Sequence, residues 1–192
     1  LMNNIGLYTD DAAKISIELA NTTDENANAF IATFQKSYLK EYLDLDVESS
    51  LQLAKKLSYQ FNGSSKMAQK DFSQFIEFCQ SKKSLALSIP TCAQFALRMT
   101  GYGEGKNTEV YPHFKELFDF LASEEGPNQT TAQALEQSER LMKMHPLSGK
   151  DYITAYKYGI KKQGLQLSKG QALELADRMT SDNLRQPASQ SR

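Results

Sequence analysis

Cysteine is scarce in this chain of 192 residues, which contains only Cys79 and Cys92. Small secreted domains that are held together by several disulfides have more cysteines in a shorter chain, so that class is excluded. The sequence has no CxxC motif and no cluster of cysteine and histidine. We therefore expect no structural zinc site, no other metal site and no cofactor.

An excess of charge of either sign is also missing, because 22 basic residues face 23 acidic ones. Proteins that bind nucleic acids or anionic membranes concentrate positive charge, so neither kind of partner is expected. No apolar run is long enough to cross a bilayer, which predicts no membrane span.

The first residues, 1–7, are too few and too polar for a signal peptide. This favours a cytoplasmic location, with export as the alternative if an upstream signal has been removed. Whether the chain is a fragment of a larger protein is left open.

The sequence does contain an internal similarity. Residues 71–100 and 151–180 align without a gap, and the aligned pairs Ser88/Ser168 and Arg98/Arg178 are among nine identities. Unrelated segments of this length would share roughly two. Weaker copies cover residues 30–58 and 114–142. The spacing of about 40 residues is that of a unit of two helices in a helical-repeat protein.

We therefore predict an all-α fold of about four tandem helical hairpins. The hairpins are expected near residues 30–58, 72–100, 114–142 and 152–180, after a helix near residues 10–20. Residues 1–185 are expected to form a single domain, and the polar end at 186–192 a disordered tail. The pattern leaves open whether the hairpins form a short α-solenoid or a compact multi-helix bundle.

Each predicted hairpin has the same internal pattern. Aromatic residues four apart, such as Phe30 and Phe34, place one face of the first helix in the core. A residue that can cap a helix precedes each second helix; these are Asp46, Ser88, Thr130 and Ser168. A column of small residues then allows the two helices to approach closely; its members are Ser50, Cys92, Ala134 and Ala172.

Cys92 belongs to this column, and Cys79 lies on the other side of the same predicted turn. Because the two cysteines align with Gly159 and Ala172, we favour two separate buried thiols that act as small apolar groups. A disulfide across the hairpin is the alternative if the chain is exported.

One basic residue recurs near the end of each second helix, and the four form a basic column of Lys56, Arg98, Arg140 and Arg178. The favoured interpretation is that each cation stabilises the negative end of its helix. The alternative is a ladder of cations along one groove that binds an acidic partner. This column is the candidate binding site.

No residue is assigned a catalytic role, because neither His113 nor His145 belongs to a recognisable catalytic motif. The acidic stretch that begins at Asp44 resembles the start of a calcium loop. Its sixth and twelfth residues are Ser49 and Lys55, where such a loop needs glycine and glutamate.

The sequence therefore favours a non-catalytic helical-repeat module that binds a protein or peptide partner. One alternative is a degenerate EF-hand-like regulatory domain without functional calcium loops. The other is an enzyme whose site is not visible in the sequence. The identity of the partner and the oligomeric state are left open.

Overall fold

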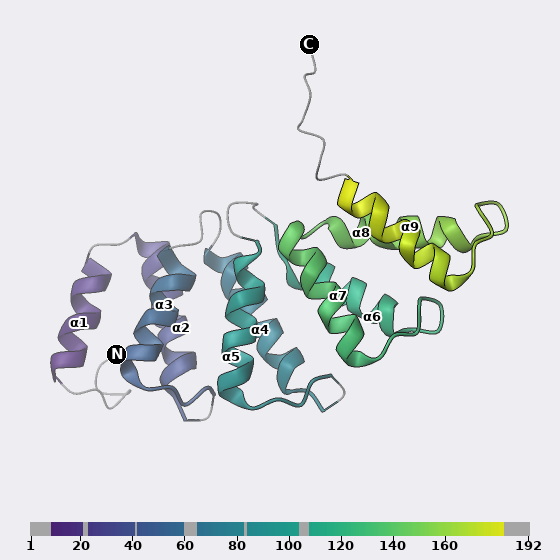
Figure 1. Cartoon of the computed structure of the whole chain (residues 1–192). Coiled ribbons are helices and arrows are strands. Elements are labelled where there is room, and N and C mark those ends of the chain that lie inside the picture. The colour runs from purple at the N-terminus through teal and green to yellow at the C-terminus, as the bar shows by residue number, and fades with distance from the viewer. Residues whose placement is uncertain are drawn as a thin grey trace, which may run out of the picture. The chain divides into compact units, whose positions relative to one another are not determined.

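The computed structural model of the chain describes residues 9–20, 23–40, 42–59, 65–82, 84–103 and 108–182. These residues form nine α-helices and no strand (Figure 1), which confirms the predicted all-α fold. The predicted tail at 186–192 lies outside the described residues. Within the described ranges, no helix combines the length and the apolar character that a membrane span requires.

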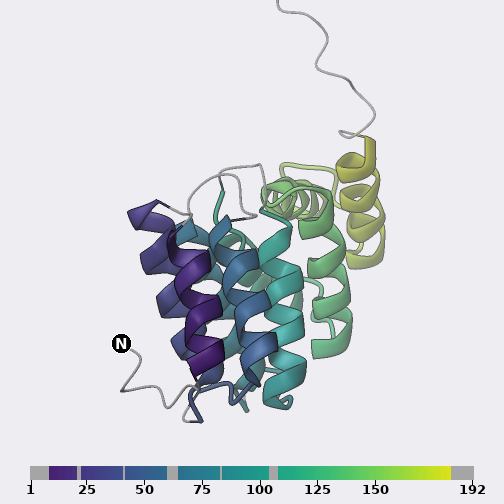
Figure 2. The same cartoon turned by 90° about the vertical axis from the view of Figure 1, so that its left-hand side faces the viewer.

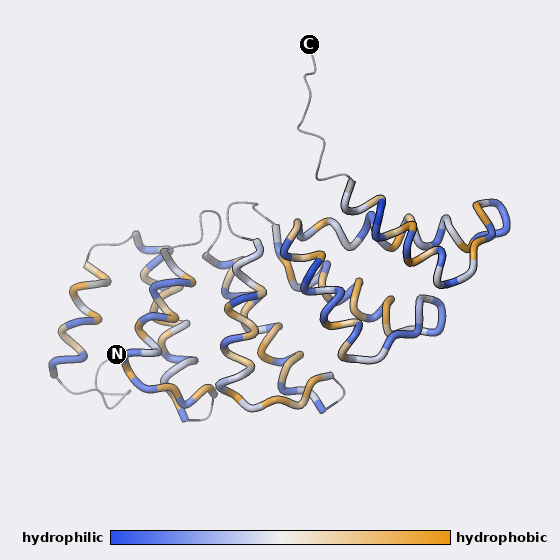
Figure 3. Tube along the Cα trace, in the orientation of Figure 1, coloured by the Kyte–Doolittle hydropathy of each residue, from blue (hydrophilic) through white to orange (hydrophobic). Residues whose placement is uncertain are grey.

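The first helix, α1 (Thr9–Ala20), is followed by four helical hairpins, as predicted. Hairpin 1 is α2 (Asp24–Tyr38) with α3 (Val47–Tyr59), and hairpin 2 is α4 (Ser65–Gln80) with α5 (Ile89–Gly101). Hairpin 3 is α6 (Tyr111–Ala122) with α7 (Thr131–Met144), and hairpin 4 is α8 (Ser148–Ile160) with α9 (Lys169–Asp182). Apolar and polar residues alternate along these helices (Figure 3), as expected of helices with one buried face.

The chain divides into two compact units, Leu1–Glu109 and Val110–Arg192. Unit 1 contains α1 and hairpins 1 and 2, and unit 2 contains hairpins 3 and 4. Each unit is described by itself below. That residues 1–185 behave as a single domain stays a prediction.

All four hairpins turn through the same backbone conformation. One residue in each turn, here called the turn residue, has a positive φ; these are Asp44 (49°), Ala86 (50°), Asn128 (59°) and Gln166 (53°). The next amide donates a hydrogen bond to a carbonyl near the end of the first helix. The four bonds, Leu45 to Ser37, Leu87 to Cys79, Gln129 to Leu121 and Leu167 to Gly159, measure 2.8–3.1 Å. The turn residue therefore gives all four hairpins a common numbering, in which position +12 is the twelfth residue after it.

The predicted caps all lie at position +2. Asp46 accepts the amide of Ser49 at 2.9 Å, and Thr130 forms a capping box with Gln133. Ser168 likewise exchanges hydrogen bonds with Gln171. Ser88 is the exception, because its hydroxyl pairs with Thr91 Oγ1 at 2.9 Å and caps no amide.

The column of small residues lies at position +6, and all four members are fully buried. It faces position −7 of the first helix. A Cβ atom added to Gly159 at that position would lie 3.0 Å from the Cβ of Ala172. The same close approach brings Cys79 and Cys92 to a Cα separation of 5.4 Å, where they form a disulfide. The favoured prediction of separate thiols is therefore wrong, because helices this close place two cysteines within bridging distance.

In unit 1, α1 packs on hairpin 1. Ile15 and Leu19 lie against a buried cluster that includes Phe30 and Phe34. Seen from that end of unit 1, α1 lies in front of α2 and α3 (Figure 2).

Hairpins stack in the same way within each unit. The first helix of the later hairpin contacts both helices of the earlier one, so α4 packs on α2 and α3, and α8 packs on α6 and α7. Position −17 of the later hairpin meets position −11 of the earlier one in both cases. In unit 1 the amide of Gln69 donates to Thr33 Oγ1 at 2.9 Å, and in unit 2 Gly149 lies against Leu117.

Candidate functional site

The four residues of the basic column all lie at position +12 and are exposed. Lys56 and Arg98 belong to unit 1, and Arg140 and Arg178 to unit 2, so the structure describes two pairs of cations. Lys56 and Arg98 lie in the last turns of α3 and α5, the position that the favoured interpretation requires of a cation that stabilises a helix end. Arg140 and Arg178 lie before the last turns of α7 and α9. Arg140 and Arg178 therefore do not occupy the last-turn position from which a cation stabilises the negative end of its helix.

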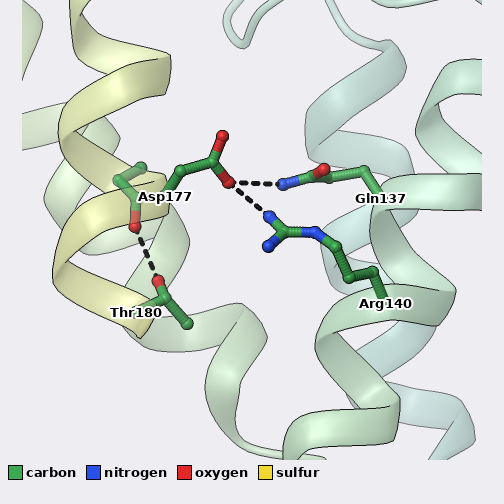
Figure 4. A network of polar contacts seen from close by, with 5 residues as sticks. Gln137, Arg140, Asp177 and Thr180 are labelled. Carbon is green, nitrogen blue, oxygen red and sulfur yellow. Dashed lines mark hydrogen bonds and ion pairs between the residues drawn. The ribbon is translucent and has the colours of Figure 1, made fainter. Parts of the chain in front are cut away.

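In unit 2, Arg140 joins two second helices. Its guanidinium forms an ion pair with Asp177 of α9, and the amide of Gln137 donates to the same carboxylate oxygen at 3.0 Å (Figure 4). Thr180, also drawn in Figure 4, donates to the carbonyl of Ala176 within α9. These contacts form a polar bridge between α7 and α9, defined here by Gln137, Arg140 and Asp177.

Tyr152 lies near this bridge and stays protonated. Burial raises the pKa of its phenol far above the ordinary value of 10, and the carboxylate of Asp177 raises that pKa further. Arg140 and a hydrogen bond with Gln137 lower the pKa, but less than burial raises it. A buried phenol that keeps its proton is not suited to acid–base catalysis near neutral pH. The bridge itself connects α7 to α9 through side-chain contacts alone.

In unit 1, the corresponding second helices, α3 and α5, border an open groove of about 480 Å³. This second-helix groove is lined by Leu45, Ser49, Gln52, Leu53, Lys56, Pro90, Ala93, Gln94 and Leu97. Of the basic column, only Lys56 lines it. No ion pair or hydrogen bond engages the Lys56 ammonium among the residues that the structure describes. Arg98 instead lies over the ring of Phe95, 5.7 Å from its centroid.

The wall of the second-helix groove has two chemical parts. Five apolar residues form one part, namely Leu45, Leu53, Pro90, Ala93 and Leu97. The amides of Gln52 and Gln94 form the other, together with Ser49 and Lys56. Both glutamines occupy position +8 of their hairpins, so the hairpin register places two exposed amides in one groove. The sequence analysis missed them, although their 42-residue separation equals that of the two turn residues.

Another groove borders the first helices of unit 1. It consists of two hollows of about 350 and 300 Å³ that share Lys36, Phe72 and Ser73. Lys36 donates a hydrogen bond across it to Ser73 at 3.1 Å. This first-helix groove also contains Lys66 at one end and Tyr42 at the other.

Four observations on the described residues concern the alternatives to a binding module. No group of three or more histidine, cysteine or carboxylate side chains is placed to hold a metal ion there. The carboxylate of Asp46 caps α3, and hydrogen bonds from the amide and hydroxyl of Ser49 lower its pKa. His145 ends α7, where its Nδ1 accepts the amide of Leu147 at 3.1 Å. The strand-like contact between turns that an EF-hand-like pair requires is not found in the described part of the chain.

Comparison with models of known protein families, with curated proteins and with solved structures finds no match to this chain.

Proposed function

We propose that this protein is a non-catalytic helical-repeat module that binds a peptide segment of a protein partner in the second-helix groove. The observation that carries the proposal is the groove itself, which combines an apolar wall, two amides and one unpaired cation. The shared turn conformation and the shared stacking positions support the interpretation of the chain as a helical repeat that arose by internal duplication.

The apolar part of the wall provides the affinity. Peptide side chains that bury against Leu53 and Leu97 leave water, which contributes roughly 25 cal/mol for each Å² of apolar surface removed. Gln52 donates one amide hydrogen to Glu48 Oε1 at 3.4 Å, which leaves its second amide hydrogen and its carbonyl for a ligand. Together with the amide of Gln94, these groups can bond the main chain of a bound peptide. Such bonds do not depend on the peptide sequence, and they therefore position the peptide more than they select it.

Lys56 provides the selectivity. Its ammonium lies on the wall of the groove without a described partner, and it attracts a carboxylate on the bound segment. The expected ligand is a short peptide that carries apolar residues next to an aspartate or glutamate.

The test uses the purified full chain and a displayed library of random 12-residue peptides. Selected peptides are synthesised with a fluorophore, and their affinities are measured by fluorescence anisotropy. We expect the selected peptides to be acidic and apolar. We expect Lys56→Glu to weaken the affinity for these peptides about tenfold or more, and a tenfold loss corresponds to about 1.4 kcal/mol.

The matched control is Lys66→Glu, which makes the same charge change in the first-helix groove. Wild-type affinity is expected for this variant. If Lys66→Glu weakens peptide binding and Lys56→Glu does not, the peptides bind in the first-helix groove and the proposed site is wrong. If the library yields no binder, the proposed function is wrong.

A further inference from the structure

The polar bridge of unit 2 and the second-helix groove of unit 1 use equivalent positions. Counted from the turn residues, the bridge occupies +9 and +12 of hairpin 3 and +11 of hairpin 4, with Gln137, Arg140 and Asp177. The same three positions of hairpins 1 and 2 line the second-helix groove; they are Leu53, Lys56 and Leu97. Because hairpins stack in the same way within each unit, we treat the groove as the counterpart of the bridge.

The cation is present in both units, but the carboxylate is not. At +12, Lys56 takes the place of Arg140, and both residues are exposed. At +11, Leu97 takes the place of Asp177, and both residues are partly exposed. Arg140 therefore has an ion pair, whereas no ion pair engages Lys56 among the residues that the structure describes.

The place that corresponds to the carboxylate lies in an open groove in unit 1. Leu53, Lys56 and Leu97 all border this groove, which has a volume of about 480 Å³. In unit 2, the carboxylate of Asp177 pairs with Arg140 and also accepts the amide of Gln137 at 3.0 Å. A carboxylate that enters the groove of unit 1 from solvent meets the same kind of cation, and Lys56 attracts it.

Position +8 also differs between the units. It holds Gln52 and Gln94 in unit 1, and Glu136 and Glu174 in unit 2, and all four residues are exposed. The neutral amides do not oppose an acidic ligand, whereas the two carboxylates repel it. An acidic segment is therefore directed to the second helices of unit 1 and away from those of unit 2.

Given that the second-helix groove binds an acidic peptide, which is the proposed function, we propose that the peptide carboxylate occupies in unit 1 the place that the carboxylate of Asp177 occupies in unit 2. The peptide carboxylate pairs with Lys56, and the apolar neighbours of the acidic residue pack on Leu53 and Leu97. In unit 2 the chain fills the equivalent place with its own side chain. Each chain therefore binds one peptide.

The first test needs no peptide. Leu97→Asp in the full chain restores a carboxylate at +11, which is expected to pair with Lys56 as Asp177 pairs with Arg140. Its titration is followed by NMR of 13C-labelled aspartate, with Lys56 present and in the Lys56→Met background. We expect a lower pKa for the introduced carboxyl when Lys56 is present, because an opposite charge favours the ionised form. Equal pKa values in the two backgrounds would show that the positions do not meet in unit 1, and would overturn the proposal.

The second test uses the fluorescent peptides selected against wild type. Leu97→Asn is the matched control, because it removes the same apolar surface without adding a charge. We expect Leu97→Asp to weaken the affinity for these peptides about tenfold or more relative to Leu97→Asn, since its carboxylate takes the place of the ligand's. Equal helix content, measured by circular dichroism, shows that both variants are folded.

The third test needs no variant. Wild type at a concentration well above the dissociation constant is titrated with peptide, and saturation is expected at one peptide per chain. Saturation at two peptides per chain would show that Asp177 does not close unit 2, and would overturn the proposal.

The outcomes separate this proposal from the proposed function. If no peptide binds wild type, the proposed function is wrong and this proposal is wrong with it. If peptides bind wild type and Leu97→Asp binds them as tightly as Leu97→Asn, the peptide carboxylate lies elsewhere. In that case the groove still binds peptides, and only the placement of the carboxylate is wrong.

Discussion

Two cysteines occupy the place in hairpin 2 where the other hairpins carry smaller or apolar residues. Position −7 contacts position +6 in hairpins 2 and 4, and the residues at these two positions of the four hairpins are Ser37/Ser50, Cys79/Cys92, Leu121/Ala134 and Gly159/Ala172. Only the second pair can be linked covalently. The disulfide therefore stabilises a close approach that the fold requires in any case.

Replacing both cysteines tests this role. Cys79→Ala/Cys92→Ala puts small apolar residues in the same place, so the hairpin is expected to keep its geometry. Removing a link across 13 residues of sequence separation is expected to cost about 2–4 kcal/mol of unfolding free energy. Urea unfolding followed by circular dichroism measures the loss.

The control is the same measurement in a reducing agent. Wild type should then unfold at the urea concentration of the double variant, whereas the double variant should not respond. If the reducing agent does not change the urea concentration at which wild type unfolds, the result supports two separate thiols, as the sequence favoured.

The candidate site shows where sequence reasoning ends at the scale of residues. The recurrence of Arg140 and Lys56 at one position was predictable from the repeat. Their different surroundings were not, because the partner of Arg140 is Asp177, 37 residues away, and the pairing depends on how two hairpins stack. A periodic pattern specifies which residues are equivalent, but not what lies opposite each of them.

Among the helices and turns, the hairpins were predictable because periodicity and caps act locally. The capping residues Asp46, Thr130 and Ser168 and the helix near Asp10–Ala20 were predicted before any packing was known. The predictions of where the first helices of the hairpins begin were less accurate. The α4 helix begins at Ser65, ahead of the predicted residue 72, because its first turns lack the aromatic spacing that defined the pattern.

The shared turn provides a prediction at this scale. Ala86 has a φ of 50°, a conformation that costs a residue with a Cβ about 1–2 kcal/mol. Glycine adopts it freely but loses more entropy on folding, by roughly 0.5–1 kcal/mol. Ala86→Gly is therefore expected to raise the unfolding free energy by a few tenths of a kcal/mol up to about 1 kcal/mol.

Urea unfolding measures the effect, and Ser84→Gly is the matched control. Ser84 lies in the same turn but does not have a positive φ. Glycine at this position should therefore lower the unfolding free energy of the protein, because it loses more entropy on folding and relieves no strain. Equal effects of the two substitutions would mean that the turn residue is not strained.

At the scale of the whole molecule, the sequence predicted one domain over residues 1–185, whereas the contacts divide the chain into two compact units. The division was not predictable from spacing. The turn residues Ala86 and Asn128, on either side of it, are 42 residues apart, the same spacing as Asp44 and Ala86 within unit 1. The second-helix groove was not predictable from spacing either, because its apolar wall is formed by residues of both α3 and α5.

The domain prediction is tested by dividing the chain between Glu109 and Val110. Residues 1–109 include the buried cluster around Phe30 and the disulfide of hairpin 2, and residues 110–192 include the bridge of Arg140 and Asp177. Because hairpins in such arrays contact mainly their neighbours, each fragment keeps its own interface between hairpins. We expect both fragments to be helical by circular dichroism and to unfold cooperatively in urea.

A fragment of residues 1–85 is the matched control. It ends in the turn of hairpin 2 and separates α4 from α5, so Phe75 loses the ring of Phe95 that packs against it at 5.8 Å. This fragment is expected to lose the helix content of hairpin 2 and to unfold at a lower urea concentration than residues 1–109. If residues 1–109 are themselves unfolded while the full chain is folded, the two units depend on each other, and the single domain predicted from the sequence is correct.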